Sequence, residues 1–153
     1  MSAFEIEPEP TPLTRIKVFG VGGAGANAVD FMLNAGVPNV EFAVINTDTR
    51  VLERAKCESR IQIGAAITNG LGAGGNPDVG YKCAEASADD IRAALQNTDM
   101  VFISAGMGGG TGTGAAPVVA RLAREMGILT VAIVTKPFRF EGRQRMKKAE
   151  GGL

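Results

Sequence analysis

The feature that most constrains how this chain can fold is a run of glycines at positions 106–114. Six of these nine residues are glycine, and the run lies between an apolar, β-rich segment at 100–105 and a helical pattern that begins near residue 115. Glycine is costly in conformational entropy, and no packing requirement visible in the sequence explains so many of them. Such a loop can wrap backbone N–H groups around phosphate oxygens, with threonine hydroxyls as further donors. The run consists of Gly106, Met107, Gly108, Gly109, Gly110, Thr111, Gly112, Thr113 and Gly114.

The rest of the chain alternates between short apolar runs and helical patterns. The pattern predicts strands at 16–21, 42–46, 61–63, 100–105 and 129–135, and helices at 24–35, 78–86, 88–95 and 115–126. Near-continuous apolar strands are typical of a parallel sheet that is covered on both faces. The sequence therefore predicts an α/β fold with a Rossmann-like, doubly wound, mostly parallel sheet in residues 15–153. Residues 1–14 are acidic and proline-rich, and we expect them to form a disordered tail.

Two further glycine clusters lie where ligands bind in such sheets, beyond the ends of the strands. The cluster at 20–25 opens the first predicted helix, where backbone N–H groups and Asn27 offer donors to a phosphate. The cluster at 70–75 leads into Asn76-Pro77, which predicts a helix start. The first cluster also fits the G-x-G-x-x-G pattern, with Asp48 about 23 residues further on, so an NAD(P)-binding oxidoreductase module is an alternative. A turn that binds no ligand is an alternative interpretation of either cluster taken alone.

Composition removes several classes of function. The formal net charge is zero and no segment reaches the roughly 18 apolar residues of a membrane span, so we expect neither nucleic-acid binding nor direct membrane insertion. The chain has no histidine, which removes the usual general base and most zinc sites. Cys57 and Cys83 match no metal-ligand spacing and predict reduced, unpaired thiols. No Gly-Lys-Ser/Thr follows the glycine run, so it is not a P-loop, and the phosphate charge must be met by backbone dipoles, a cation or both.

Several of these segments resemble the FtsZ family of tubulin-like, GTP-binding cell-division proteins. Residues 108–114 spell GGGTGTG, the tubulin signature as it occurs in that family. The resemblance covers nearly all of residues 15–153 and includes 22–27, 46–48 (NTD), 70–77, 135–138 (TKPF) and 140–145. Rossmann dehydrogenases lack the GGGTGTG loop, and tubulins proper differ around residues 22–27, so the match is specific.

The resemblance implies a fold of the tubulin/FtsZ GTPase-domain type that binds GTP and GDP, with Mg²⁺ or K⁺ on the nucleotide phosphates and no metal site of the protein's own. It implies that residues 22–27 and 108–114 wrap the phosphates, with hydroxyls from Thr111 and Thr113, and that residues 72–74 sense the γ-phosphate. Glu141 would accept from the ribose hydroxyls and Arg145 would approach the ribose and phosphate. Without the resemblance, the spacing of Glu141 and Arg145, four residues apart, also fits an ion pair on the surface of a helix.

The nucleotide-binding residues that the resemblance implies come from four segments, with two further residues at the nucleotide's edge or at a subunit interface. The four segments contribute Gly22, Gly23, Ala24, Gly25, Ala26, Asn27, then Gly72, Ala73, Gly74, then residues 106–114, and then Thr135, Pro137, Glu141 and Arg145, and the two edge residues are Asn46 and Asp48.

In the family, the nucleotide domain continues beyond residue 153. A central helix there carries an aromatic ring and an aspartate for the guanine base, and the next loop brings acidic residues to the neighbouring subunit's nucleotide. The resemblance therefore implies a GTP-binding half of a filament-forming GTPase that builds the bacterial division ring, truncated before the central helix and second domain. We expect no catalytic residue in this chain and inefficient turnover by the chain alone.

Partners and location also follow from the resemblance. We expect head-to-tail self-association in the bacterial cytoplasm at the division site, and a C-terminal half or another copy that covers the truncated edge of the sheet. A non-catalytic structural assembly fragment is the remaining alternative.

Overall fold

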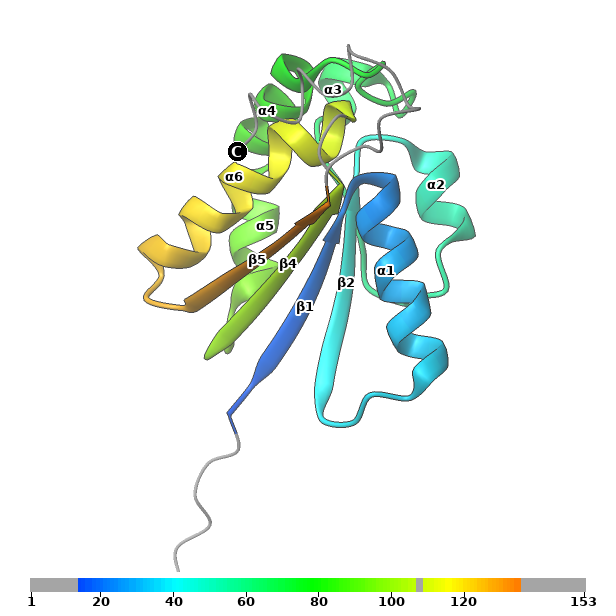
Figure 1. The fold of residues 1–153 in the computed structure, drawn as a ribbon. Coiled ribbons are helices and arrows are strands. Elements are labelled where there is room, and N and C mark those ends of the chain that lie inside the picture. Colours follow the sequence, from blue (N-terminus) through cyan, green and yellow to red (C-terminus); the bar gives the residue numbers. More distant parts are fainter. Residues whose placement is uncertain (1–13, 107–108, 136–153) are drawn as a thin grey trace, which may run out of the picture.

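Five parallel strands form the centre of the computed structural model, which describes residues 14–106 and 109–135 (Figure 1). The sheet order is β3-β2-β1-β4-β5, and the register pairs Val21 with both Ile45 and Ala105, so that β1, β2 and β4 end level with one another. Because all the strands are parallel, their carboxyl ends lie along one edge of the sheet. The strands are β1 (Ile16–Val21), β2 (Val40–Asn46), β3 (Arg60–Gln62), β4 (Met100–Gly106) and β5 (Leu129–Thr135).

Helices cover both faces of this sheet (Figure 1). One face carries α1 (Gly22–Ala35) and α2 (Thr49–Arg54), and the other carries α4 (Pro77–Ala86), α5 (Ala88–Leu95) and α6 (Gly110–Glu125), while the short α3 (Ala65–Thr68) follows β3. Successive strand residues point to opposite faces and enter two separate cores.

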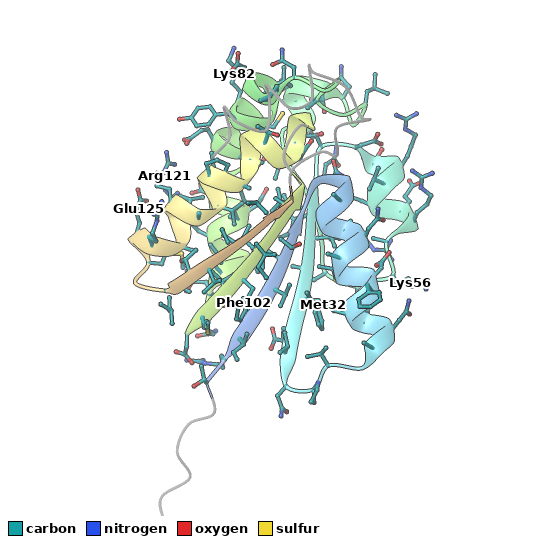
Figure 2. The ribbon with its side chains drawn as sticks, viewed as in Figure 1. Met32, Lys56, Lys82, Phe102, Arg121 and Glu125 are labelled. Carbon is teal, nitrogen blue, oxygen red and sulfur yellow. The ribbon has the colours of Figure 1, made fainter. Side chains whose placement is uncertain are left out.

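The two cores are visible in β1 and β4. Val18 of β1 packs into the core under α1 and α2, and the next residue, Phe19, packs into the core under α5 and α6. Met32 of α1 and Phe102 of β4 pack against the first of these cores (Figure 2). A sheet that separates two apolar cores is the doubly wound arrangement that the sequence predicts.

The predicted strands are confirmed, and their ends differ from the predicted ones by no more than two residues. The helix α6 differs more, since it begins at Gly110 rather than near residue 115. Two short helices were not predicted: α2 is too short to show a helical period, and α3 lies inside the stretch 64–75, which the sequence presents as a glycine-rich loop.

Three other expectations concern the N-terminal tail, the two cysteines and membrane insertion. The predicted tail falls outside the described residues, except for the exposed Thr14. Cys57 and Cys83 are unpaired, as expected, and the structure shows in addition that both are buried. In the described part of the chain, no helix has the length and apolar character needed to cross a membrane.

Candidate functional site

The carboxyl-end edge of the sheet, at the top of Figure 1, brings together the segments that the sequence singles out. Residues 21–25 lead from β1 into α1, residues 46–49 lead from β2 into α2, and the run 106–114 leads from β4 into α6. In an open parallel sheet, this edge is where ligands bind.

Loop 70–76 reaches the same edge, although it connects α3 to α4. The Thr49 N–H donates to the Gly70 carbonyl at 3.1 Å, and Asp48 forms an antiparallel bridge with Leu71. Gly72 has a φ of +96°, a conformation that residues with a side chain rarely adopt. These contacts hold the third glycine cluster beside the β2–α2 connection.

The two longest helices of the described residues, α1 and α6, begin at this edge without a side-chain cap. Their N-cap residues are Val21 and Gly109, and neither helix has an acidic residue in its first turn. In contrast, Asp48 caps α2 by accepting from the Arg50 N–H at 2.9 Å, and Asn76 caps α4. The first N–H groups of a helix lack intrahelical acceptors and carry the positive end of its dipole, so α1 and α6 both offer a binding position for an anion.

The first turns of α1 and α6 touch each other. Gly22 has a φ of +76°, and a Cβ added there would lie 2.9 Å from the backbone nitrogen of Gly112. A Cβ at Gly110 would lie 2.7 Å from the backbone nitrogen of Asn76. The start of α6 is therefore enclosed between α1 and loop 70–76, and the three predicted phosphate loops are neighbours.

Packing explains several glycines in the run 106–114, which corrects the expectation that it explains none. At Gly114 an added Cβ would lie 2.6 Å from the Tyr81 backbone nitrogen in α4, and at Gly112 it would lie 2.6 Å from the Gly106 carbonyl oxygen. At Gly80 of α4 it would lie 3.0 Å from the carbonyl carbon of Gly110 in α6. Gly80 and Gly114 therefore let the backbones of α4 and α6 come into contact, and Gly112 lets the first turn of α6 lie against the end of β4.

Gly23 and Gly109 are glycines of a different kind. Nothing in the described chain lies within 4 Å of the position that a Cβ would take at either residue, and neither residue has a left-handed backbone. Gly23 is in the first turn of α1, and Gly109 is the N-cap of α6. Open space at the starts of both uncapped helices is what the close approach of a ligand to the backbone requires.

A buried hydroxyl pair joins the β2–α2 connection to α6. The Oγ1 atoms of Thr47 and Thr111 are 2.7 Å apart, and Thr47 is fully buried. Beside them, Asn46 Oδ1 accepts from the N–H groups of Thr47 and Asp48 at 2.8 and 3.1 Å. The Asn46 side-chain oxygen therefore shapes the turn after β2.

Asp48 carries a carboxylate next to loop 70–76. Its Oδ1 accepts from Arg50 Nε at 3.2 Å and its Oδ2 accepts from Arg50 Nη2 at 3.0 Å. Hydrogen bonding to the Arg50 guanidinium lowers the pKa of Asp48 below its ordinary value of 3.8. Among the described residues, no group of three or more acidic or cysteine side chains is arranged to hold a metal ion.

The implied residues of the first helix divide by exposure. Gly23, Ala24 and Asn27 are exposed, whereas the other three implied residues of that helix are buried. Gly23 and Asn27 also belong to an open groove of about 360 Å³ between α1 and α2, which Arg54 of α2 lines from the other side. Gly23 and Asn27, on the exposed side of α1, therefore face this groove.

The remaining implied residues are only partly placed. Thr135 pairs with Gly106 in the β4–β5 register, so its backbone lies beside the glycine run. The others lie outside the described residues: Met107, Gly108, Pro137, Glu141 and Arg145.

The predicted site residues do not include three residues that lie at this edge. Thr47 lies within the segment 46–48 but was given no role. Arg50 follows Asp48 at the spacing of a capping residue and its donor, and Gly80 lies within a helical pattern. Only Arg50 has a signal in the sequence, because an aspartate directly after a buried strand is a good N-cap.

A doubly wound parallel sheet whose carboxyl edge brings two uncapped helix starts and three glycine loops together defines a nucleotide-binding α/β domain. Residues 15–153 match the family described as the Tubulin/FtsZ family, GTPase domain, and the chain belongs to that family.

Individual relatives agree with this assignment. The chain is 62% identical over 139 residues to the cell division protein FtsZ of Bartonella bacilliformis, a match that covers 91% of this chain and 24% of that protein. An empty FtsZ dimer from M. jannaschii superposes with a TM-score of 0.88 at 50% identity, covering 91% of this chain and 40% of that one. A GTPγS-bound protofilament of CetZ2 from Haloferax volcanii gives a TM-score of 0.81 at 27% identity, covering 91% and 45%. The chain thus spans about a quarter of the curated relative's length.

Proposed function

We propose that this chain is the GTP- and GDP-binding part of a filament-forming, tubulin-like GTPase that builds the bacterial division ring. The observation that carries the proposal is the convergence of the uncapped starts of α1 and α6, with open space at Gly23 and Gly109. Membership of the Tubulin/FtsZ GTPase-domain family supports a guanine nucleotide as the ligand.

The phosphates lie across these two helix starts. Backbone N–H groups of residues 22–25 and 109–111 bind the α- and β-phosphates, and loop 72–74 closes over the γ-phosphate. If Thr47 donates its proton to Thr111, the Thr111 proton is available to a phosphate oxygen, since a hydroxyl can accept and donate at once. Thr135, Pro137, Glu141 and Arg145 contact the sugar and the neighbouring phosphate, and Mg²⁺ or K⁺ accompanies the nucleotide.

Hydrolysis and assembly involve a second subunit. Acidic residues of the adjacent subunit complete the catalytic site in a head-to-tail filament, in the bacterial cytoplasm at the division site and without nucleic acid or direct membrane insertion. The edge strand β5 has Leu129 and Ile133 exposed at 63% and 44%, and a C-terminal half or another copy of the chain covers them.

Titration of the purified chain with GDP, ADP and NAD tests the proposal, with guanosine as the control that lacks phosphates. We expect GDP to bind more tightly than NAD, and guanosine to bind much more weakly than GDP because the phosphates provide most of the contacts. Tighter binding of NAD than of GDP would favour a dinucleotide-binding oxidoreductase, which the family assignment does not support. A purely structural fragment would give no thermal shift with any of these ligands.

A further inference from the structure

We propose that Arg50 balances the charge of Asp48 in the nucleotide site. By holding both carboxylate oxygens of Asp48, Arg50 allows a terminal phosphate to bind beside loop 70–76 without a divalent cation at Asp48. This inference rests on the proposed function, and it concerns which charge balances Asp48 when a triphosphate is bound.

Asp48 is placed where its charge affects a ligand. Its backbone bridges Leu71, and its Oδ2 lies 3.5 Å from the position that a Cβ would take at Gly72, the first of the three residues proposed to close over the γ-phosphate. Its neighbour Thr47 contacts Thr111 in the first turn of α6. A bare carboxylate here would repel the outermost phosphate, because like charges a few ångströms apart at a partly buried site are poorly screened.

Such a site can be neutralised in three ways. Protonation of Asp48 is opposed near neutral pH, because the Arg50 hydrogen bonds lower its pKa. A divalent cation can bridge the carboxylate and the phosphate, since both supply the oxygen ligands that Mg²⁺ prefers. The third way is a cationic side chain, and the planar guanidinium of Arg50 pairs with both oxygens of Asp48 at 3.2 and 3.0 Å.

The side chain of Arg50 can be replaced without removing the N-terminal cap of α2. The cap on this helix is the bond from the Arg50 backbone N–H to Asp48 Oδ1, which does not depend on the guanidinium. The side chain of Arg50 is 70% exposed and that of Asp48 is 20% exposed. Arg50→Gln therefore removes the charge while the capping bond stays in place, and Asp48→Asn keeps a good N-cap residue.

The test measures GTPγS and GDP affinity for the wild-type chain and Arg50→Gln, with either EDTA or Mg²⁺ present. In Arg50→Gln we expect EDTA to weaken GTPγS binding on the order of threefold to tenfold more than in the wild type, because the unpaired carboxylate then needs the cation. GDP affinity should change by less than about twofold, since GDP has no phosphate beside loop 72–74.

Two variants serve as controls. The double variant Asp48→Asn/Arg50→Gln should return to wild-type behaviour in EDTA, because neither charge remains. Arg92→Gln makes the same substitution in another exposed Asp–Arg pair, with Asp89 on α5 at 3.1 Å, and should behave like the wild type.

Each outcome bears on the proposal. Equal sensitivity of Arg50→Gln and wild type to EDTA, or a double variant that stays as sensitive as the single one, would overturn the role of Arg50 and leave the proposed function intact. A wild-type chain that binds neither nucleotide would overturn the proposed function, and this inference with it.

Discussion

The hydroxyl oxygens of Thr47 and Thr111 lie 2.7 Å apart in the protein interior, although 64 residues separate them in the chain. Thr47 follows β2 on the way to α2, and Thr111 is in the first turn of α6, which follows β4. The pair therefore ties together two crossovers that start at different strands. The same turn of α6 touches Gly22 of α1, so the hydroxyl pair lies next to the contact between the two helix starts that form the proposed phosphate site.

The first prediction concerns this pair. Thr47→Val leaves the Thr111 hydroxyl buried without its partner, and we expect it to lower the free energy of unfolding by about 1–3 kcal/mol. The double variant Thr47→Val/Thr111→Val should lose less than the sum of the single variants, since it leaves no orphaned hydroxyl. Urea unfolding without nucleotide measures this, and strictly additive losses would show that the two hydroxyls do not interact.

The second prediction separates a ligand requirement from a folding requirement at Gly109. Its φ is −85° and the space for a Cβ is open, so backbone strain does not contribute there. We expect Gly109→Ser to change the unfolding free energy by no more than about 0.5 kcal/mol, while GDP affinity falls by tenfold or more, on the order of the 1.4 kcal/mol that a tenfold change represents. Gly23→Ala should behave in the same way. Circular dichroism and GDP titration check both, and unchanged GDP affinity in both variants would show that neither glycine faces the phosphates.

The third prediction is the reverse case at Gly114. Its Cβ would lie 2.6 Å from the Tyr81 nitrogen, so Gly114→Ala forces α4 and α6 apart. We expect the free energy of unfolding to fall by about 1–3 kcal/mol, whether or not nucleotide is present, because overpacking strains the contact between the two helices. An unchanged melting temperature would show that the two helices can separate at no cost.

These opposite glycine effects show where sequence reasoning reached its limit. The fold class and the strands were predictable because apolar period and length identify buried parallel strands. The glycine run was correctly placed at the connection from β4 to α6, but its residues 110–114 are the first turns of α6 and not part of a loop. The sequence also does not distinguish a glycine that touches another helix, such as Gly114, from one that faces open space, such as Gly109. That distinction depends on the crossing of α4 and α6, a contact between segments that are distant in the chain.

The site was predictable to a similar extent. The three loops could be recognised from composition and from a resemblance, and the structure brings them together. The Thr47–Thr111 pair and the Asp48–Arg50 pair could not be predicted as contacts, because a side-chain partner is decided by the three-dimensional path of the backbone. The proposed roles of Glu141 and Arg145 stay predictions, since both residues lie outside the described part of the chain.

The fourth prediction is a pH dependence at the α4–α6 contact. Arg121 Nη1 of α6 lies 2.6 Å from Glu85 Oε1 of α4 (Arg121 is labelled in Figure 2). Arg121 lowers the pKa of Glu85 below its ordinary value of 4.5. A carboxyl whose pKa is lower in the folded state stabilises the fold above its unfolded pKa, and this stabilisation is lost as the pH falls through the folded pKa. Glu85→Gln should therefore be less stable than wild type at pH 7, and this difference should shrink as the pH falls below 4.5 and through the lowered pKa of Glu85. Urea unfolding at pH 7 and over a series of acidic pH values checks this, and a difference that does not change with pH would contradict it.

The last prediction concerns turnover. In the described part of the chain, Asp48 and Asp78 flank the glycine loops, but Asp48 is paired with Arg50 and Asp78 is exposed in the first turn of α4. We therefore expect neither carboxylate to orient a water at the γ-phosphate. Because phosphoryl transfer depends almost entirely on positioning and electrostatics, this 153-residue chain should release phosphate from GTP several orders of magnitude more slowly than a full-length relative from the Tubulin/FtsZ GTPase-domain family.

The assay for this prediction needs a control for binding, because a chain that binds no GTP would also turn over none. GTPγS affinity should be measured on the same sample, so that slow release reflects missing catalytic groups rather than an empty site. Adding the part of the relative that follows its match to this chain should restore release if that part supplies the acidic residues. Release by the lone chain at the rate of the full-length relative would show that a catalytic group lies within these 153 residues, and Asp48 and Asp78 would then be the first residues to replace with asparagine.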